Sequence, residues 1–383
     1  MYFDNASTTK IDDEVISIIN TSLKNDYHNP SSIYYDGRIH NEYIKEAKRD
    51  ICKVINADDI KNIYFTSGGT EGNNWIIRGW IDHLIYVSKI KFKPHIITSE
   101  IEHHSVLNVC KFLEQAQLAT VTYLKPNLKG KICVEHVQDN IQDNTVLVSI
   151  MAVNNVLGVA NDIHGIGKLC KEKNIVFHTD AVQGLGKTNI NVQRDHIDFL
   201  TCSGHKIHSP KGIGFIYAKH PILLQPLLYG GLQEFGMRAG TENIPYIKAL
   251  HFCINKYCNA KLIIRNYIET NHIKGYLMRQ LHKGFTDKEI IVGDIGTINI
   301  AFKNITADSL VWELGQQNVY VSIGSACDNG SLEPNYVLQS IYMSPEYING
   351  NIRITFDNNN TLQECEKMID ILQATILKLR GYL

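Results

Sequence analysis

A lysine between two histidines is the residue of this chain best suited to covalent chemistry. Lys206 lies in "TCSGHKIHSPKGIG", directly after a short apolar run and directly before a glycine-rich one. A lysine at the end of a buried strand points into a site, and burial lowers its pKa. The neutral amine that results can attack an aldehyde. The alternative is a structural lysine held in a salt bridge.

An aspartate ends a second apolar run. "FHTDAVQ" places Asp180 at this position and Gln183 three residues later. A carboxylate at a buried strand end needs a cationic or hydrogen-bonding partner. A lysine that forms a Schiff base and an aspartate that pairs with a pyridinium nitrogen are the combination that pyridoxal phosphate enzymes use. On its own, Asp180 could equally cap a turn or a helix.

Two further runs also end in polar residues. "FTSGGTEGNN" leads through Gly69 and Thr70 into a helix, and free N–H groups at a helix start favour a phosphate. It lacks the Walker A pattern, and a plain tight turn is the alternative. "TSEIEHHSVL" places His103 and His104 after a strand. Two histidines are too few for a zinc site, so a surface or core role is the alternative.

The C-terminal third holds a candidate nucleophile and a candidate anion site. Cys327 lies in "VSIGSACDNGSLEPN", whose small residues predict an accessible loop of the kind a reactive thiol needs. The other eight cysteines are interpreted as buried apolar residues. Arg353, in "NIRITF", is either a surface charge or a fork for a substrate carboxylate.

The elements that position these residues follow from the apolar pattern. Six runs lack polar alternation, which predicts strands covered on both faces of a mainly parallel sheet. They are 62–66, 94–99, 145–153, 174–180, 197–203 and 213–218. A helix with Asp162 as its N-cap separates two of them, so the chain is predicted to be α/β with right-handed crossovers. Ligands bind at the carboxyl ends of strands in such sheets.

The pattern changes after about residue 260. The runs around 295–303, 319–324 and 350–356, a helix around 307–317 and a final helix from Thr361 predict a smaller α+β domain. We expect a large domain over 16–259. A small domain over 1–15 and 260–383 is expected to carry the nucleophile loop at about 322–335.

Composition excludes several classes of function. The 383 residues are 44% hydrophobic and 20% charged, with a net charge of -1, which is typical of a soluble globular protein. This balance disfavours direct binding to nucleic acid or to a membrane surface. The nine cysteines form no C-x-x-C pair, so no metal site and no disulfide framework is expected, and reduced thiols favour the cytoplasm.

Taken together, these motifs resemble those of the cysteine desulfurases, fold-type I pyridoxal phosphate enzymes of the class V aminotransferase group. The resemblance runs nearly end to end. It rests on "YFDNASTT", "NPSS", "FTSGGTEGNN", "EHHSVL", "VNN", "HTDAVQ", "SGHKIHSPKGIG", "GGLQEFGMRAGTEN" and "GSACDNGSLEPNYVL".

The resemblance implies a role for each matched residue. Lys206 would hold pyridoxal phosphate covalently, Asp180 would pair with its ring nitrogen, and Gln183 would bond its ring hydroxyl. His103, rather than His104, would stack on the ring and act as the acid–base group. The phosphate would be held by Gly69, Thr70, Ser203 and His205, completed by Thr241 of the neighbouring subunit of a homodimer.

The resemblance also implies the reaction. Asn155 and Arg353 would bind the carboxylate of L-cysteine, and Cys327 would take the sulfur as a persulfide while L-alanine leaves. An acceptor or scaffold protein would then collect the sulfur. Its destination stays open among iron–sulfur cluster assembly, tRNA thiolation, cofactor synthesis and DNA phosphorothioation. A selenocysteine lyase, another enzyme of the group and a non-catalytic partner protein are the alternatives.

The sequence departs from the family pattern at four places. Val156 stands where glutamate is usual, and Ser209 stands where glycine is usual. Asp328 follows the candidate nucleophile, and a carboxylate beside a thiol raises its pKa. "FDNNN" after Arg353 replaces the usual Gly-Arg.

Overall fold

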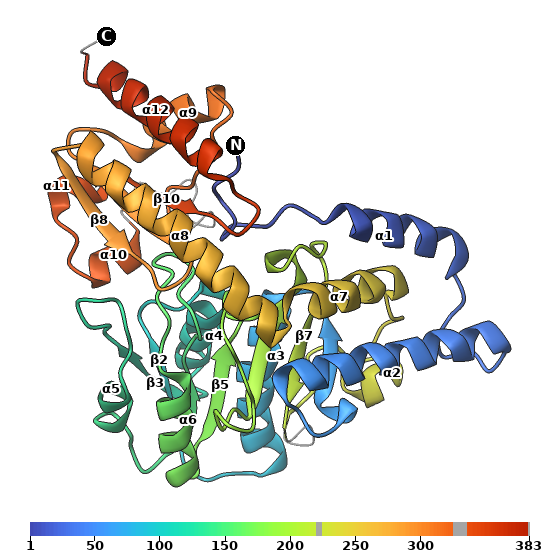
Figure 1. Cartoon of the computed structure of the whole chain (residues 1–383). Coiled ribbons are helices and arrows are strands. Elements are labelled where there is room, and N and C mark those ends of the chain that lie inside the picture. Colours follow the sequence, from blue (N-terminus) through green and yellow to red (C-terminus); the bar gives the residue numbers. More distant parts are fainter. Residues whose placement is uncertain (220–223, 325–334, 382–383) are drawn as a thin grey trace.

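The computed structural model describes residues 1–219, 224–324 and 335–381 (Figure 1). Its strands are β1 Ile63–Thr66, β2 His95–Ser99, β3 Thr120–Leu124, β4 Thr145–Ser149, β5 Val176–Asp180, β6 Phe199–Ser203, β7 Gly214–Ala218, β8 Lys288–Val292, β9 Thr297–Phe302 and β10 Asn351–Thr355. Its α-helices are α1 Asp13–Asn25, α2 Tyr35–Ile55, α3 Gly69–Asp82, α4 His104–Gln115, α5 Val134–Gln138, α6 Ile163–Glu172, α7 Ile244–Tyr257, α8 Ala260–Gly284, α9 Ala307–Gln316, α10 Tyr336–Ser340, α11 Pro345–Ile348 and α12 Leu362–Leu379.

The first seven strands form one sheet in the order β1-β7-β6-β5-β4-β2-β3. Strands β3, β2, β4, β5 and β6 pair in parallel, and β7 is antiparallel to both of its neighbours. This arrangement confirms the predicted α/β class with a mainly parallel sheet. Strand β3 was not predicted, because it is an edge strand with an exposed Thr120 and only one fully buried residue.

Successive residues of the central strands enter different cores, as strands covered on both faces require. In β6, Phe199 packs with α3 and α4, whereas Leu200 packs with α2, α6 and α7. Helix α6 begins as predicted, because the side chain of Asp162 accepts a hydrogen bond from the backbone of Gly165. The run 145–153 is a strand only as far as Ser149.

A second sheet, in the order β10-β9-β8, is antiparallel and packs with α8, α9 and α12 around its own core. The long helix α8 runs from the side of the large sheet to this second sheet (Figure 1). The predicted strand at 319–324 forms isolated bridges from Tyr320 and Ser322 instead of a ladder. Helix α1 spans the expected domain boundary between residues 15 and 16.

The first nine residues lie between the two sheets. Phe3 belongs to the core of the second sheet, and its carbonyl accepts the backbone N–H of Thr355. Farther along, the backbone N–H of Thr9 bonds the carbonyl of His205, which follows β6 of the large sheet. This N-terminal strap, residues 3–9, therefore contacts both parts of the molecule.

In the described part of the chain, no helix combines the length and the apolarity that crossing a bilayer requires.

Candidate active site

A cavity of about 250 Å³ lies at the carboxyl ends of the parallel strands, between the large sheet, the N-terminal strap and β10. Ten of the residues that the sequence singled out line it. They are Gly69, Thr70, His103, Asn155, Asp180, Gln183, Ser203, His205, Lys206 and Arg353. Parallel strands end at the same edge of a sheet, which explains why residues so far apart in sequence meet here.

Lys206 ends a short 3₁₀ turn, Gly204–Lys206, that follows β6 directly. Its Nζ donates to the carbonyls of Ala6 and Ser7, at 2.6 Å each. The N-terminal strap thus forms one wall of the cavity beside the amine. The preceding His205 is largely buried beside several lysines, which lowers its pKa to about 4, so its ring is neutral at pH 7.

Asp180 ends β5 and is buried. One carboxylate oxygen accepts from the side-chain amide of Asn73 at 2.7 Å, and the other accepts from the backbone of Val182 at 2.9 Å. The two donors fix the plane of the carboxylate at the cavity wall. Asn73 was not identified from the sequence, although it lies four residues after Gly69 and therefore on the same face of α3.

The start of α3 has the backbone shape of an anion cradle. Gly68, its N-cap, has a φ of +147°, which side chains other than glycine rarely adopt. A Cβ on Gly69 would lie 2.7 Å from the side chain of Val182, so glycine is required there too. The N-terminal N–H groups of the helix therefore open onto the cavity beside Thr70 and Ser203.

His103 lines the cavity, whereas His104 does not line it and packs its ring 5.0 Å from that of Tyr336. His103 is the N-cap of α4, and its Nδ1 lies 2.8 Å from the hydroxyl of Ser105. Ser105 Oγ also accepts from Asn73 at 2.8 Å. A chain of hydrogen bonds thus joins His103 to Asp180 through Ser105 and Asn73.

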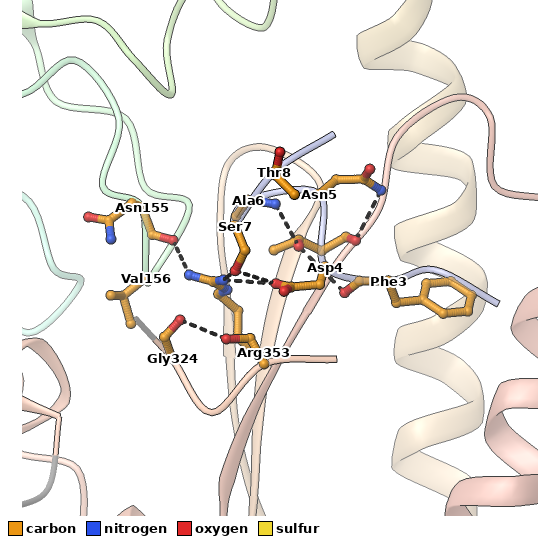
Figure 2. Close-up of polar contacts among 12 residues, drawn as sticks. Phe3, Asp4, Asn5, Ala6, Ser7, Thr8, Asn155, Val156, Gly324 and Arg353 are labelled. Carbon is orange, nitrogen blue, oxygen red and sulfur yellow. Dashed lines mark hydrogen bonds and ion pairs between the residues drawn. The ribbon is translucent and has the colours of Figure 1, made fainter. Parts of the chain in front are cut away.

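Arg353 enters the cavity from β10 and is almost fully buried. Figure 2 shows its guanidinium between the backbone of Asn155 and the N-terminal strap. One terminal nitrogen donates to the carbonyl of Asn155 at 2.8 Å, and the other donates to Asp4 at 2.9 Å and to Ser7 at 2.7 Å. Within the described residues, the side-chain carbonyl of Asn155 is buried without a hydrogen-bond partner.

Gln183 is held by a lysine that sequence analysis missed. Its carbonyl oxygen accepts from Lys187 at 2.7 Å, and its amide nitrogen donates to the carbonyl of Ala6 at 2.8 Å. Burial lowers the pKa of Lys187 to about 8. The spacing of four residues after Gln183 is the only sequence signal that could have suggested this contact.

The other described residues that the sequence singled out do not line this cavity. Thr241 is exposed and does not line this chain's cavity. Cys327 and Asp328 lie outside the described residues. Val156 is fully buried in an apolar cluster rather than in the cavity. Ser209 is also buried, 3.0 Å from where a Cβ on Gly204 would lie.

The segment that departs from the family pattern after Arg353 binds the N-terminal strap and Tyr2, which precedes it. The side chain of Asn360 accepts from the side chain of Asn5 at 3.4 Å and donates to the carbonyl of Tyr2 at 3.0 Å.

Across the described ranges, no three histidine, cysteine or acidic side chains form a group that could hold a metal ion.

A family model, a curated relative and two solved structures match this chain over most or all of its length. The model of the family described as aminotransferase class-V matches residues 1–368. The chain is 36% identical over 388 residues to "Cysteine desulfurase IscS" of Methanosarcina thermophila, covering 100% of this chain and 93% of that protein. A solved structure named "NIFS-LIKE PROTEIN" matches with a TM-score of 0.89 at 28% identity, covering 100% of both chains. Another, "SspA in complex with cysteine", matches with a TM-score of 0.80 at 32% identity, covering 93% of this chain and 98% of that one.

Proposed function

Because this chain belongs to the aminotransferase class-V family and matches a cysteine desulfurase along its whole length, it is a pyridoxal phosphate-dependent cysteine desulfurase, and we propose a role for each residue of its cavity. The observation that carries the proposal is the convergence of Lys206, Asp180 and Arg353 on one cavity. An amine, a carboxylate for a ring nitrogen and a carboxylate-binding guanidinium are the three groups that the reaction of an amino acid on this cofactor requires.

The residues present fit pyridoxal phosphate. The cradle at Gly68 and Gly69, which a Cβ would fill, suits a phosphate. Asp180, oriented by two donors, faces the same cavity as the Lys206 amine, as a pyridinium ring with an aldehyde requires. When bound, the cofactor supplies an electron sink that makes cleavage of the cysteine Cβ–S bond feasible.

We assign the other roles from the contacts of each side chain. Asp180 holds a proton on the ring nitrogen through its negative charge. Arg353 and the side-chain amide of Asn155 bind the substrate carboxylate, the guanidinium as the charged partner and the amide NH₂ as a further donor. His103, whose Nδ1 is held by Ser105, moves a proton at Nε2. Gln183, oriented by Lys187, bonds the ring hydroxyl, and Thr70, Ser203 and His205 bind the phosphate.

Cys327 is proposed as the group that accepts the sulfur. The substrate loses its Cβ–S bond and gains a proton as L-alanine, while the thiol of Cys327 becomes a persulfide. A second thiol, on an acceptor protein, then takes the outer sulfur by exchange. We further propose a homodimer in which Thr241 completes the partner's phosphate site, a cytoplasmic location, and the domain division at residues 15/16 and 259/260.

Labelled cysteine tests this assignment. Wild-type protein loaded with pyridoxal phosphate and given 35S-cysteine is expected to release alanine and to retain label that a reducing agent removes. Cys327→Ala is expected to keep the visible absorbance of the bound cofactor and to retain no label. Cys133→Ala, at a free and partly buried cysteine, is the matched control. Equal labelling of the Cys327→Ala and wild-type proteins would place the persulfide elsewhere. Candidate acceptors for cluster assembly, tRNA thiolation and phosphorothioation are then added to see which receives the label.

A further inference from the structure

The motif "DNAST" at residues 4–8 has no role in the reaction as described so far, although part of it lines the cavity. Ala6 and Ser7 belong to the cavity wall, and their carbonyls accept from Lys206. The backbone N–H of Ser7 bonds the carbonyl of Asp4, which closes a tight turn. The turn brings the side chains of Asp4 and Ser7 to the same nitrogen of Arg353 (Figure 2).

These three side chains form a closed triangle of hydrogen bonds. Arg353 donates to Asp4 Oδ1 and to Ser7 Oγ, and Ser7 Oγ itself donates to Asp4 Oδ1 at 2.8 Å. The Arg353 side chain is 2% exposed and that of Asp4 is 18% exposed. A buried guanidinium requires a counter-charge, and a guanidinium held at several points has a fixed plane. The triangle therefore determines how Arg353 faces the cavity.

The strap that carries the triangle is itself fixed on both sides. The carbonyl of Phe3 and the N–H of Asn5 bond the backbone of Thr355 in β10, two residues from Arg353. On the other side, Thr9 bonds the carbonyl of His205, next to Lys206. A substrate carboxylate therefore meets a preset arginine, because these backbone bonds fix the segment that carries Asp4 and Ser7.

We propose that Asp4 and Ser7 are positioning residues that set the plane of Arg353 and thereby make the cavity selective for ligands with a carboxylate. This proposal rests on the proposed function, in which Arg353 binds the carboxylate of L-cysteine. Ser7 adds a second connection, since its hydroxyl accepts from Arg353 while its carbonyl accepts from Nζ of Lys206, the atom that would bind the cofactor.

Two ligands that share the thiol but differ in charge test the proposal on the cofactor-loaded protein. 3-Mercaptopropionate carries the carboxylate without the amine, and cysteamine carries the amine without the carboxylate. Calorimetric titration of Asp4→Ala and Ser7→Ala is expected to show binding of 3-mercaptopropionate weakened about tenfold or more, with binding of cysteamine unchanged. For L-cysteine, KM rises by a similar factor while kcat changes little, as for loss of uniform binding.

The matched control is Asp13→Ala, which removes a carboxylate that is 86% exposed. Ser7→Ala keeps the ion pair of Arg353 with Asp4, so it tests the proposal even where Asp4→Ala fails to fold. Unchanged or tighter binding of 3-mercaptopropionate to both variants would overturn the proposal, as would equal weakening of the two ligands. Failure of the wild type to form alanine would contradict the proposed function instead, because the calorimetric comparison needs no turnover.

Discussion

A buried ion pair anchors the glycine-rich loop at 230–243, and removing its charges tests how that loop is held. Lys48 of α2 donates to Glu234 at 2.8 Å, and the two side chains are 3% and 5% exposed. The same oxygen of Glu234 accepts the backbone N–H of Phe65 in β1 at 3.0 Å. The Lys48 ammonium also lies 4.8 Å from the ring centre of Phe235.

The expected cost follows from leaving one charge without its partner. Lys48→Met leaves a buried carboxylate, and Glu234→Gln leaves a buried ammonium beside a neutral amide. Breaking a buried pair from one side costs about 3–5 kcal/mol of the free energy of unfolding, whereas removing both charges is often neutral. The double variant Lys48→Met/Glu234→Gln keeps an acceptor for the Phe65 N–H. Its loss of unfolding free energy is therefore expected to be smaller, by at least ~2 kcal/mol, than the sum of the losses of the two single variants.

Urea unfolding of the cofactor-loaded proteins, followed by circular dichroism, measures these differences. Lys45→Met is the control, because Lys45 lies on the same helix in an exposed pair with Glu42, and it is expected to unfold at the wild-type midpoint. Limited proteolysis shows whether cleavage at 230–243 becomes faster in the single variants. A loss in the double variant equal to the sum of the single losses would refute the coupling, and with it the idea that this pair holds the loop that carries Thr241.

Two further predictions concern buried carboxyl groups. Asp180→Asn is expected to weaken cofactor binding, measured by absorbance titration, and to lower kcat for alanine release by at least tenfold. Wild-type values for both quantities would exclude the assigned pairing of Asp180 with the ring nitrogen. Glu102 is fully buried, and its desolvation, together with the negative charge of the nearby Asp180, raises its pKa to about 8. The folded protein keeps this proton while the unfolded chain loses it above pH 4.5, so stability falls as pH rises from about 4.5 to 8. Glu102→Gln has no such proton to lose, so its unfolding free energy relative to that of wild type is expected to rise between pH 5 and 8, by up to about 1.4 kcal/mol per pH unit. Urea unfolding at several pH values measures this difference. A difference that stays constant from pH 5 to 8 would contradict the raised pKa of Glu102.

The sheet and the residues at its strand ends could be predicted because both follow from local sequence. Strands covered on both faces are continuous apolar runs, so β1, β2, β5, β6 and β7 were identified near their observed bounds. The chain direction then places the residues after each strand at one edge, which is why Asp180, His103 and Lys206 were expected in one site and are found in one cavity.

Contacts that depend on distant packing could not be predicted. Asp4 and Arg353 are 349 residues apart, and no periodicity relates them. Glu234 lies in a segment without helix or strand pattern, so its burial depends on β1 and α2 packing around it. Asn73 in α3 and Lys187 in a turn act by orienting Asp180 and Gln183, and a polar residue gives the same sequence signal whether it orients a neighbour or faces solvent.

The position of the N-terminal strap has a consequence for the order in which the protein matures during translation. Residues 3–9 are synthesised long before their partners at 353–360, since Asp4 and Arg353 are 349 residues apart. The strap must therefore wait until these later partners have been synthesised before it can dock on β10. Since it forms the wall beside Lys206 and orients Arg353, a nascent chain with a complete large sheet would still lack a working pocket.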